Sequence, residues 1–249
     1  MRLFAPLIAI AAAFGAATVL GETTPPAAIS GYDFLTPENQ ALQDDEFANP
    51  GMLWVETGAR LWGESCASCH AEGSMAGVAA RYPQWDERLG RVINLEQRIN
   101  NERQTRLGLE PLVYESEELL GLTAFISNQS RGMPIDVKID GPAAGSFARG
   151  RDFFYARRGQ LNLSCANCHE QHVGDHLRAE TISQGQTNGF PIYRALWQEM
   201  GSTHRMFAWC NVAVRAEPYE LGSQEYVDLE LFQRWRSTGL TIETPAIRR

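Results

Sequence analysis

The sequence predicts a mainly helical chain that folds as two small domains in tandem, and three observations support this fold class. The pentapeptide Cys-x-x-Cys-His occurs twice, at residues 66–70 and 165–169, so the motif cysteines are 99 residues apart. Ahead of each copy, a glycine (Gly58 and Gly150) is followed three and four positions later by large apolar residues, which is a helical spacing. The 249 residues are enough for two compact domains of about 100 residues each.

The two pentapeptides have the spacing of covalent haem attachment. The two thiols of Cys-x-x-Cys add to the vinyl groups of one haem, and the adjacent histidine supplies the proximal ligand to its iron. A redox dithiol or half of a zinc site explains the bare Cys-x-x-Cys but not a histidine at the fifth position in both copies. The fifth cysteine makes a simple disulfide framework a poor explanation. We therefore expect two haem c groups, attached through Cys66, Cys69, Cys165 and Cys168, with His70 and His169 as proximal ligands.

The N-terminal segment divides into a leader and an arm. Residues 1–21 are uncharged after Arg2 and read as a signal peptide, although a retained membrane anchor is the alternative. No second apolar stretch approaches that length, so we expect an exported protein without stable membrane insertion after cleavage. Residues 22–50 contain four prolines among small and acidic residues, and they predict an extended arm with little structure of its own.

The first domain, residues 51–140, shows two further helical patterns. Apolar residues recur with a helical period over Leu89–Leu107. Ser116 is placed to cap a second helix that buries apolar residues as far as Ile126. Glycines and prolines from residue 131 to 142 then mark the junction with the second domain, residues 141–249, whose middle is made irregular by Gly185, Gly189 and Pro191. This is the pattern of small c-type cytochrome domains.

The composition excludes one broad class of function. The net charge is −8, which gives no reason to expect nucleic acid binding. Of the 22 basic residues only Lys138 is a lysine, and arginine suits haem propionates and sulfur oxyanions, although a GC-rich genome produces the same bias.

The residue that opposes each proximal histidine decides between electron transfer and catalysis. In the second domain Cys210 is the unassigned cysteine, and an iron-bound or modified sulfur explains an odd thiol in an exported chain better than a buried free cysteine does. His172, His176 and His204 are the rival ligands, of which the first two follow the motif too closely to reach the other face of the haem. In the first domain Met133, which precedes a proline, is a candidate ligand, with simple packing as the alternative.

The segments Leu177–Gln186, Asn188–Arg194, Cys210–Asn211, Val214–Tyr219, Gly222–Val227 and Gly239–Pro245 resemble the SoxA family, the dihaem subunits of periplasmic SoxAX cytochromes. The resemblance implies two fused class I cytochrome c domains, each with one covalent haem, and a heterodimer with a monohaem SoxX-like subunit. It also implies an L-cysteine S-thiosulfotransferase reaction in the periplasm. Thiosulfate is coupled oxidatively to a cysteine of a SoxYZ-like carrier, and two electrons leave through haem.

Carried onto this sequence, the resemblance implies that His169 and Cys210 are the axial pair of the catalytic haem, with Cys210 as catalytic sulfur and a candidate for persulfide modification. The chain departs from the family where relatives have a cysteine ligand for the first haem, because Glu102 stands there. Glu102 and Met133 are therefore both candidates for the first haem. Relatives also have consecutive basic residues before the catalytic cysteine, whereas here Arg205 is followed by Met206.

Arg205, with Arg215 or Arg194, is the predicted binding group for dianionic thiosulfate, although a surface ion pair or a propionate contact explains each arginine equally well. The competing function is a dihaem electron-transfer cytochrome without sulfur-substrate chemistry. A dihaem peroxidase, which needs an open or histidine-gated iron, fits a thiolate at Cys210 poorly.

Overall fold

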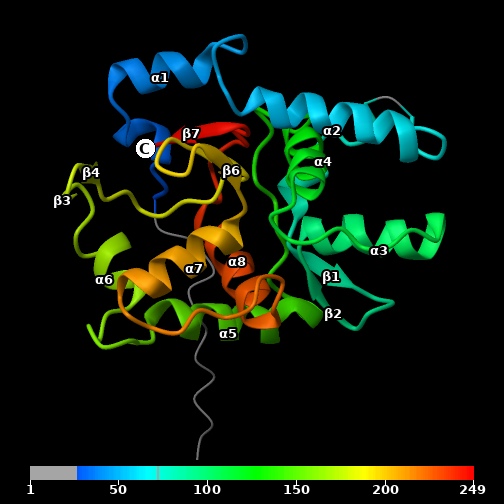
Figure 1. The fold of residues 1–249 in the computed structure, drawn as a ribbon. Coiled ribbons are helices and arrows are strands. Elements are labelled where there is room, and N and C mark those ends of the chain that lie inside the picture. Colours follow the sequence, from blue (N-terminus) through cyan, green and yellow to red (C-terminus); the bar gives the residue numbers. More distant parts are fainter. Residues whose placement is uncertain (1–26, 72) are drawn as a thin grey trace, which may run out of the picture.

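The structure is a computed structural model that describes residues 27–71 and 73–249, and it is mainly helical, as the sequence predicts (Figure 1). The predicted signal peptide, residues 1–21, lies outside the described residues. Among the helices that are described, none has the length and apolar character needed to cross a membrane.

The first half of the chain is organised by two helices that cross, α2 (Met52–Ser65) and α4 (Glu117–Asn128). The crossing is so close that a Cβ on Gly58 would lie 2.0 Å from the carbonyl oxygen of Gly121, so position 58 must be glycine. Ser116 accepts a hydrogen bond from the backbone N–H of Leu119, which confirms the predicted cap of α4. The segment between the two helices forms η2 (Ala79–Arg81), β1 (Gln84–Asp86), β2 (Arg91–Ile93) and α3 (Leu95–Leu107).

The prediction of one helix over Leu89–Leu107 is wrong at its start, because α3 begins only at Leu95. The side chain of Asp86 accepts hydrogen bonds from the backbone N–H groups of Arg88 and Leu89, and Gly90 follows with a φ of +62°. These contacts make a tight turn between two antiparallel strands. The apolar residues that mimicked a helical period therefore belong to β2.

The second half repeats the helix crossing with α5 (Ala144–Tyr155) and α8 (Gln224–Arg236). Here a Cβ on Gly150 would lie 1.9 Å from the carbonyl oxygen of Asp228. The intervening chain forms α6 (Cys165–His169), β3 (His176–Leu177), β4 (Glu180–Thr181), β5 (Ile192–Arg194), β6 (Glu199–Gly201) and α7 (Thr203–Ala213), and η3 (Gly141–Ala143) leads into α5. The two halves thus share one plan.

The likeness is closest in the segment that ends in α3 and in α7. Each copy has a cis proline, then a two-stranded hairpin of the same register, then a helix capped by a polar side chain. Residue numbers in the two copies differ by 108 throughout, as for the strand starts Gln84 and Ile192 and the caps Asn94 and Ser202. The sequence alone does not reveal this repeat, because the pentapeptides are offset by a different number of residues.

The prediction that residues 22–50 form an extended arm with little structure is wrong for the part that the structure describes. This part contains η1 (Gly31–Phe34) and α1 (Pro37–Asp44), the latter capped by Thr36 with Pro37 in the first turn. Gln43 accepts hydrogen bonds from the backbone of Ile247 and from Arg248, each at 3.0 Å. This segment therefore packs on β7 (Ala246–Arg248), which pairs in parallel with β5 (Figure 1).

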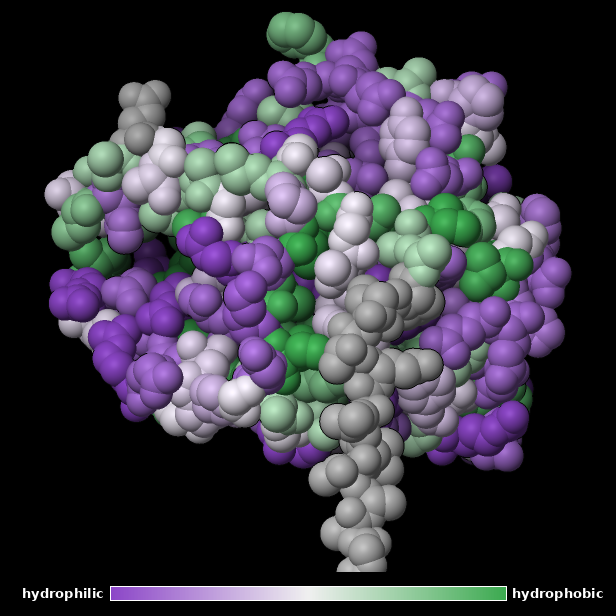
Figure 2. Space-filling model, turned by 180° about the vertical axis from the view of Figure 1, so that it is seen from behind, coloured by the Kyte–Doolittle hydropathy of each residue, from purple (hydrophilic) through white to green (hydrophobic). Residues whose placement is uncertain are grey.

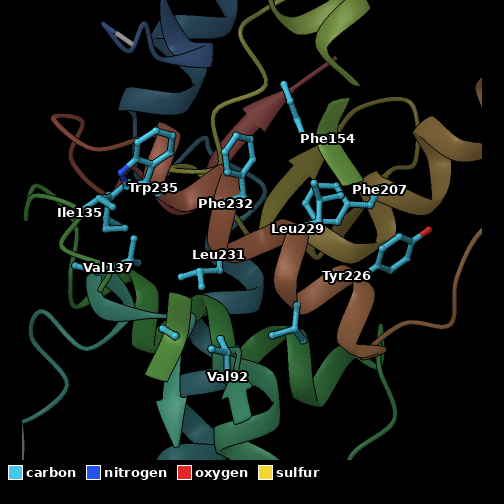
Figure 3. Close-up of a cluster of buried hydrophobic side chains, with 14 of the residues drawn as sticks. Val92, Ile135, Val137, Phe154, Phe207, Tyr226, Leu229, Leu231, Phe232 and Trp235 are labelled. Carbon is cyan, nitrogen blue, oxygen red and sulfur yellow. The ribbon is translucent and has the colours of Figure 1, made fainter. Parts of the chain in front are cut away.

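The largest hydrophobic core lies around α8 and draws on both halves of the chain. Tyr226, Leu229 and Phe232 of α8 meet Phe154 of α5, and Val92 of β2 reaches the same cluster (Figure 3). A second cluster, centred on α3 and α4, lies in the first half. The domain boundary predicted at residue 140 stays a prediction, and buried side chains from both sides of it share one core.

Candidate functional site

The second pentapeptide is held in a defined conformation by its own polar residues. The Ser164 side chain accepts a hydrogen bond from the backbone N–H of Asn167, and the Asn167 side chain accepts one from the backbone N–H of Ser164. This reciprocal capping starts the short helix α6 at Cys165 and presents the motif cysteines and His169 from one turn.

His169 is oriented by the loop that follows β4. Its Nδ1 lies 2.8 Å from the carbonyl oxygen of Ser183, so Nδ1 carries the proton and donates it, and Nε2 is left for a metal. A Cβ on Gly185 would lie 2.9 Å from Cγ of His169, so only glycine lets this loop contact the ring. Burial of the ring lowers the pKa of His169, which favours the neutral imidazole that binds metals.

Cys210 lies on α7, close to the motif thiols of α6. Burial, followed by the nearby Cys165 thiol, raises the pKa of Cys210 to about 12, and the Arg194 guanidinium opposes this rise. The free thiol is therefore a poor nucleophile at neutral pH, and a bound metal is what makes such a sulfur a thiolate. The structure thus brings together four predicted residues, Cys165, Cys168, His169 and Cys210.

Two of the predicted arginines take different places around this group. Arg194 is buried, binds the Glu180 carboxylate at 2.8 and 3.0 Å, and has its guanidinium 5.2 Å from the ring centres of Trp197 and Trp209. Arg205 binds Glu199 at 2.9 Å and lies 4.4 Å over Trp197. Since five residues turn a helix by about 140° past a full turn, Arg205 and Cys210 leave α7 on different sides.

The first pentapeptide lies beside a cavity. Cys66 ends α2, and the ring centre of His70 lies 5.4 Å from that of Trp62. The cavity beside them has a volume of about 580 Å³ and is lined by Trp62, Ala67, His70, Ala71, Gly73, Phe125 and Gln129. Figure 2 shows the molecule hollowed on the side where α2 ends.

The residues around both pentapeptides fit a haem. The first cavity has the size of a cofactor site and largely apolar walls. The charge of Arg103 acts on Cys66, and the charge of Arg236 acts on Cys165. Each of these arginines has a buried Nε without a hydrogen-bond partner in the described structure. Guanidinium groups placed in this way suit the carboxylates of haem propionates. These two arginines were not singled out by the sequence, because nothing local distinguishes them from the other arginines.

The two candidate ligands for the first haem lie outside the cavity lining. Glu102 is bound by Arg98 at 3.0 Å and by Arg88 at 3.2 Å. Met133 has both backbone groups bonded, its N–H to Ser130 and its carbonyl to the N–H of Ile242. Neither side chain is therefore among the described residues that line the cavity with His70.

The rival histidines are accounted for by other contacts. His172 and His176 are exposed, and Nδ1 of His172 lies 2.9 Å from Asp175. His204 is buried between the halves, accepts the backbone N–H of Gly222 at Nδ1, and has Nε2 3.1 Å from the Glu230 carboxylate. His204 is thus committed to a polar cluster at the start of α7, which the sequence did not suggest.

Known proteins resemble this chain over most of its length. A model of the SoxA/TsdA cytochrome c domain matches residues 52–135. The L-cysteine S-thiosulfotransferase subunit SoxA of Pseudaminobacter salicylatoxidans is 43% identical, with 88% of this chain and 80% of the relative covered. The subunit of that name from Paracoccus pantotrophus is 39% identical, with 94% and 86% covered. A crystal structure of SoxXA from P. pantotrophus matches with a TM-score of 0.87 and 40% identity, covering 91% of this chain and 92% of the other. These likenesses confirm the predicted cytochrome c fold and haem c as its cofactor.

Proposed function

Since the chain belongs to the SoxA family of L-cysteine S-thiosulfotransferase subunits, we propose that its second haem centre couples thiosulfate oxidatively to a cysteine of a SoxYZ-like carrier protein. A new S–S bond forms between the carrier sulfur and the terminal sulfur of thiosulfate, and the S–H bond of the carrier cysteine breaks. The product is an S-thiosulfonate, one proton passes to water, and two electrons leave through haem c. The observation that carries the proposal is the position of Cys210 beside Cys165, Cys168 and His169.

Each of these residues has a defined part in the proposal. Cys165 and Cys168 would hold the haem through thioether bonds, His169 would bind its iron, and Cys210 would be a second iron ligand and the catalytic sulfur. Bound haem supplies an iron that accepts the electrons one at a time. The fixed proton on Nδ1 of His169 keeps the ring in the tautomer that binds through Nε2.

The charges near Cys210 suit an anionic substrate. Arg194 is the guanidinium that acts on the Cys210 sulfur, and Trp209 beside it is exposed on the surface. Arg205, whose side chain is 29% exposed, is ion-paired with Glu199 and lies over Trp197, a ring that Arg194 also contacts, so its part in the proposal is to attract thiosulfate at the surface rather than to bind it at the sulfur. Of the arginines predicted to bind substrate, Arg194 is therefore the one that acts on the Cys210 sulfur.

The wider setting follows from the family. The crystallised relative from P. pantotrophus is part of SoxXA. The proposal makes a SoxX-like cytochrome the partner that takes the electrons. The proposal places the mature chain in the periplasm, with a second haem c on Cys66, Cys69 and His70. It also includes an extra sulfur atom on Cys210. The mass of the intact purified chain tests the haem count and the extra sulfur together.

Replacement of Cys210 tests the reaction itself. In the complex with its SoxX-like partner, Cys210→Ala should abolish thiosulfate-dependent formation of the carrier S-thiosulfonate, followed by mass spectrometry of the carrier. Val212→Ala is the matched control, because Val212 is exposed on the same helix. S-thiosulfonate formation that survives Cys210→Ala would overturn the catalytic role of this sulfur, whereas a wild-type complex that forms none would favour the electron-transfer cytochrome.

A further inference from the structure

Glu102 and Cys210 occupy the same place in the two copies of the internal repeat. Each is the eighth residue of its helix, α3 from Leu95 and α7 from Thr203, and their numbers differ by the same 108 residues as the hairpins before them. The position that carries a sulfur beside the second pentapeptide therefore carries a carboxylate in the first half.

The surroundings of this position change together with it. Three arginines bind the Glu102 carboxylate: Arg98 at 3.0 Å, Arg88 at 3.2 Å and Arg106 at 3.4 Å. The residues 108 positions further on are all apolar, namely Leu196, Met206 and Val214. In one copy the position is therefore the centre of an ion-pair cluster, and in the other the three equivalent positions carry no charge.

The charges around the two pentapeptides differ as well. The charges that act on Cys210 include the Cys165 and Cys168 thiols, whereas the charges that act on Cys66 are those of Arg103 and Cys69. Arg98, one of the groups that hold Glu102, is itself fixed by the Tyr82 hydroxyl at 2.9 Å and by an ion pair with Asp86. To reach an iron bound by His70, Glu102 would have to leave all three of its arginines.

The cavity beside His70 offers no substitute. Apart from His70, the described residues that line it are aromatic, alanine, glycine and one glutamine, none of which is a customary haem ligand. The Met133 side chain packs next to Gly77, where its sulfur would lie 3.4 Å from a Cβ on that glycine.

We propose that the first haem, whose attachment rests on the proposed function, has an exchangeable small ligand opposite His70 in place of a protein side chain. Water occupies the ferric iron in the isolated protein and gives way to cyanide or an anion of similar size, and the ferrous iron binds a diatomic gas such as carbon monoxide. The second haem, with Cys210 opposite His169, does not bind these ligands at comparable concentrations.

Electron paramagnetic resonance of the oxidised chain in complex with its partner tests this proposal. Beside the signal of the partner's own haem, the wild-type chain should show one high-spin and one low-spin ferric haem, and cyanide should convert the high-spin signal. Glu102→Cys places a thiol at the position equivalent to Cys210, and it should convert the first haem to low spin and abolish cyanide binding there. Glu102→Gln and Met133→Leu should leave the high-spin signal unchanged.

The outcomes separate this proposal from the proposed function. Two haems that are both low-spin before any addition, or a high-spin signal that appears only in Glu102→Gln or Met133→Leu, would overturn the exchangeable ligand and leave the reaction at Cys210 untouched. A mass with a single haem would overturn attachment at Cys66 and Cys69, and the exchangeable ligand with it.

Discussion

Glu96 should make this protein less stable as the pH rises from 6 to 8. The side chain is 6% exposed and lies with Glu230 and Arg234, both also buried, where α3 of the first half meets α8 of the second. Burial, followed by the negative charge of Glu230, raises the pKa of Glu96 from 4.5 to about 8. The folded state therefore keeps a proton that the unfolded chain releases near pH 4.5.

The sign and size follow from proton linkage. Between pH 4.5 and 8 the folded protein binds one more proton at Glu96 than the unfolded protein, so the free energy of unfolding falls as pH rises, by about 1.4 kcal/mol per pH unit at most. From pH 6 to 8 the loss is about 2 kcal/mol, because the slope flattens near the folded pKa. Glu96→Gln cannot ionise, so it lacks this loss. Between pH 6 and pH 8 its free energy of unfolding should therefore fall by about 2 kcal/mol less than that of the wild type.

Guanidinium unfolding followed by far-UV circular dichroism at pH 6, 7 and 8 measures the effect at constant ionic strength. Glu110→Gln, an exposed carboxylate in the loop after α3, is the matched control and should keep the wild-type dependence on pH. Parallel stability curves for the wild type and Glu96→Gln would refute the reasoning, since the buried carboxylate would then titrate alike in the folded and unfolded states.

Three further predictions concern packing and the second haem. Gly150→Ala should destabilise the chain by at least the ~1–3 kcal/mol typical of overpacking, measured by thermal unfolding. Gly63→Ala, in open space on α2, is the control and should be neutral or stabilising. Equal effects of the two substitutions would contradict the close crossing. Gly185→Ala should displace the proximal ring that it contacts and alter the visible spectrum of the second haem, so an unchanged spectrum would count against that contact. Arg194→Gln should shift this spectrum and Arg205→Gln should not, and the reverse result would reassign the arginine beside the sulfur.

The sequence predicted those parts of the site that depend on local spacing. The spacing of the pentapeptides is enough to pick out their cysteines and histidines. Ser116 and the apolar residues after it predicted α4 correctly. The hairpin before α3 was missed because Val92 and Ile93 match a helical period by chance, and the turn depends on contacts of Asp86. The arm was misjudged because its helix is stabilised by residues about 200 positions away.

The groups around the two pentapeptides could not be found from spacing. The equivalence of Glu102 and Cys210 appears only when the hairpins are superposed, because the chain between pentapeptide and hairpin differs in length in the two halves. Arg103 and Arg236 are distinguished from the other arginines by a buried nitrogen without a partner, which is a property of the folded chain.

The contact between the two ends of the chain has a consequence for the order of folding. Gln43 and Asn49 bond to Ile247 and Pro245 across 204 and 196 residues, so both pentapeptides lie inside a single loop that these contacts close. Contacts of such high sequence separation form late, because the entropy of closing the loop must be met before they contribute. Both pentapeptides therefore lie in a stretch of chain whose own helices can form before this loop closes.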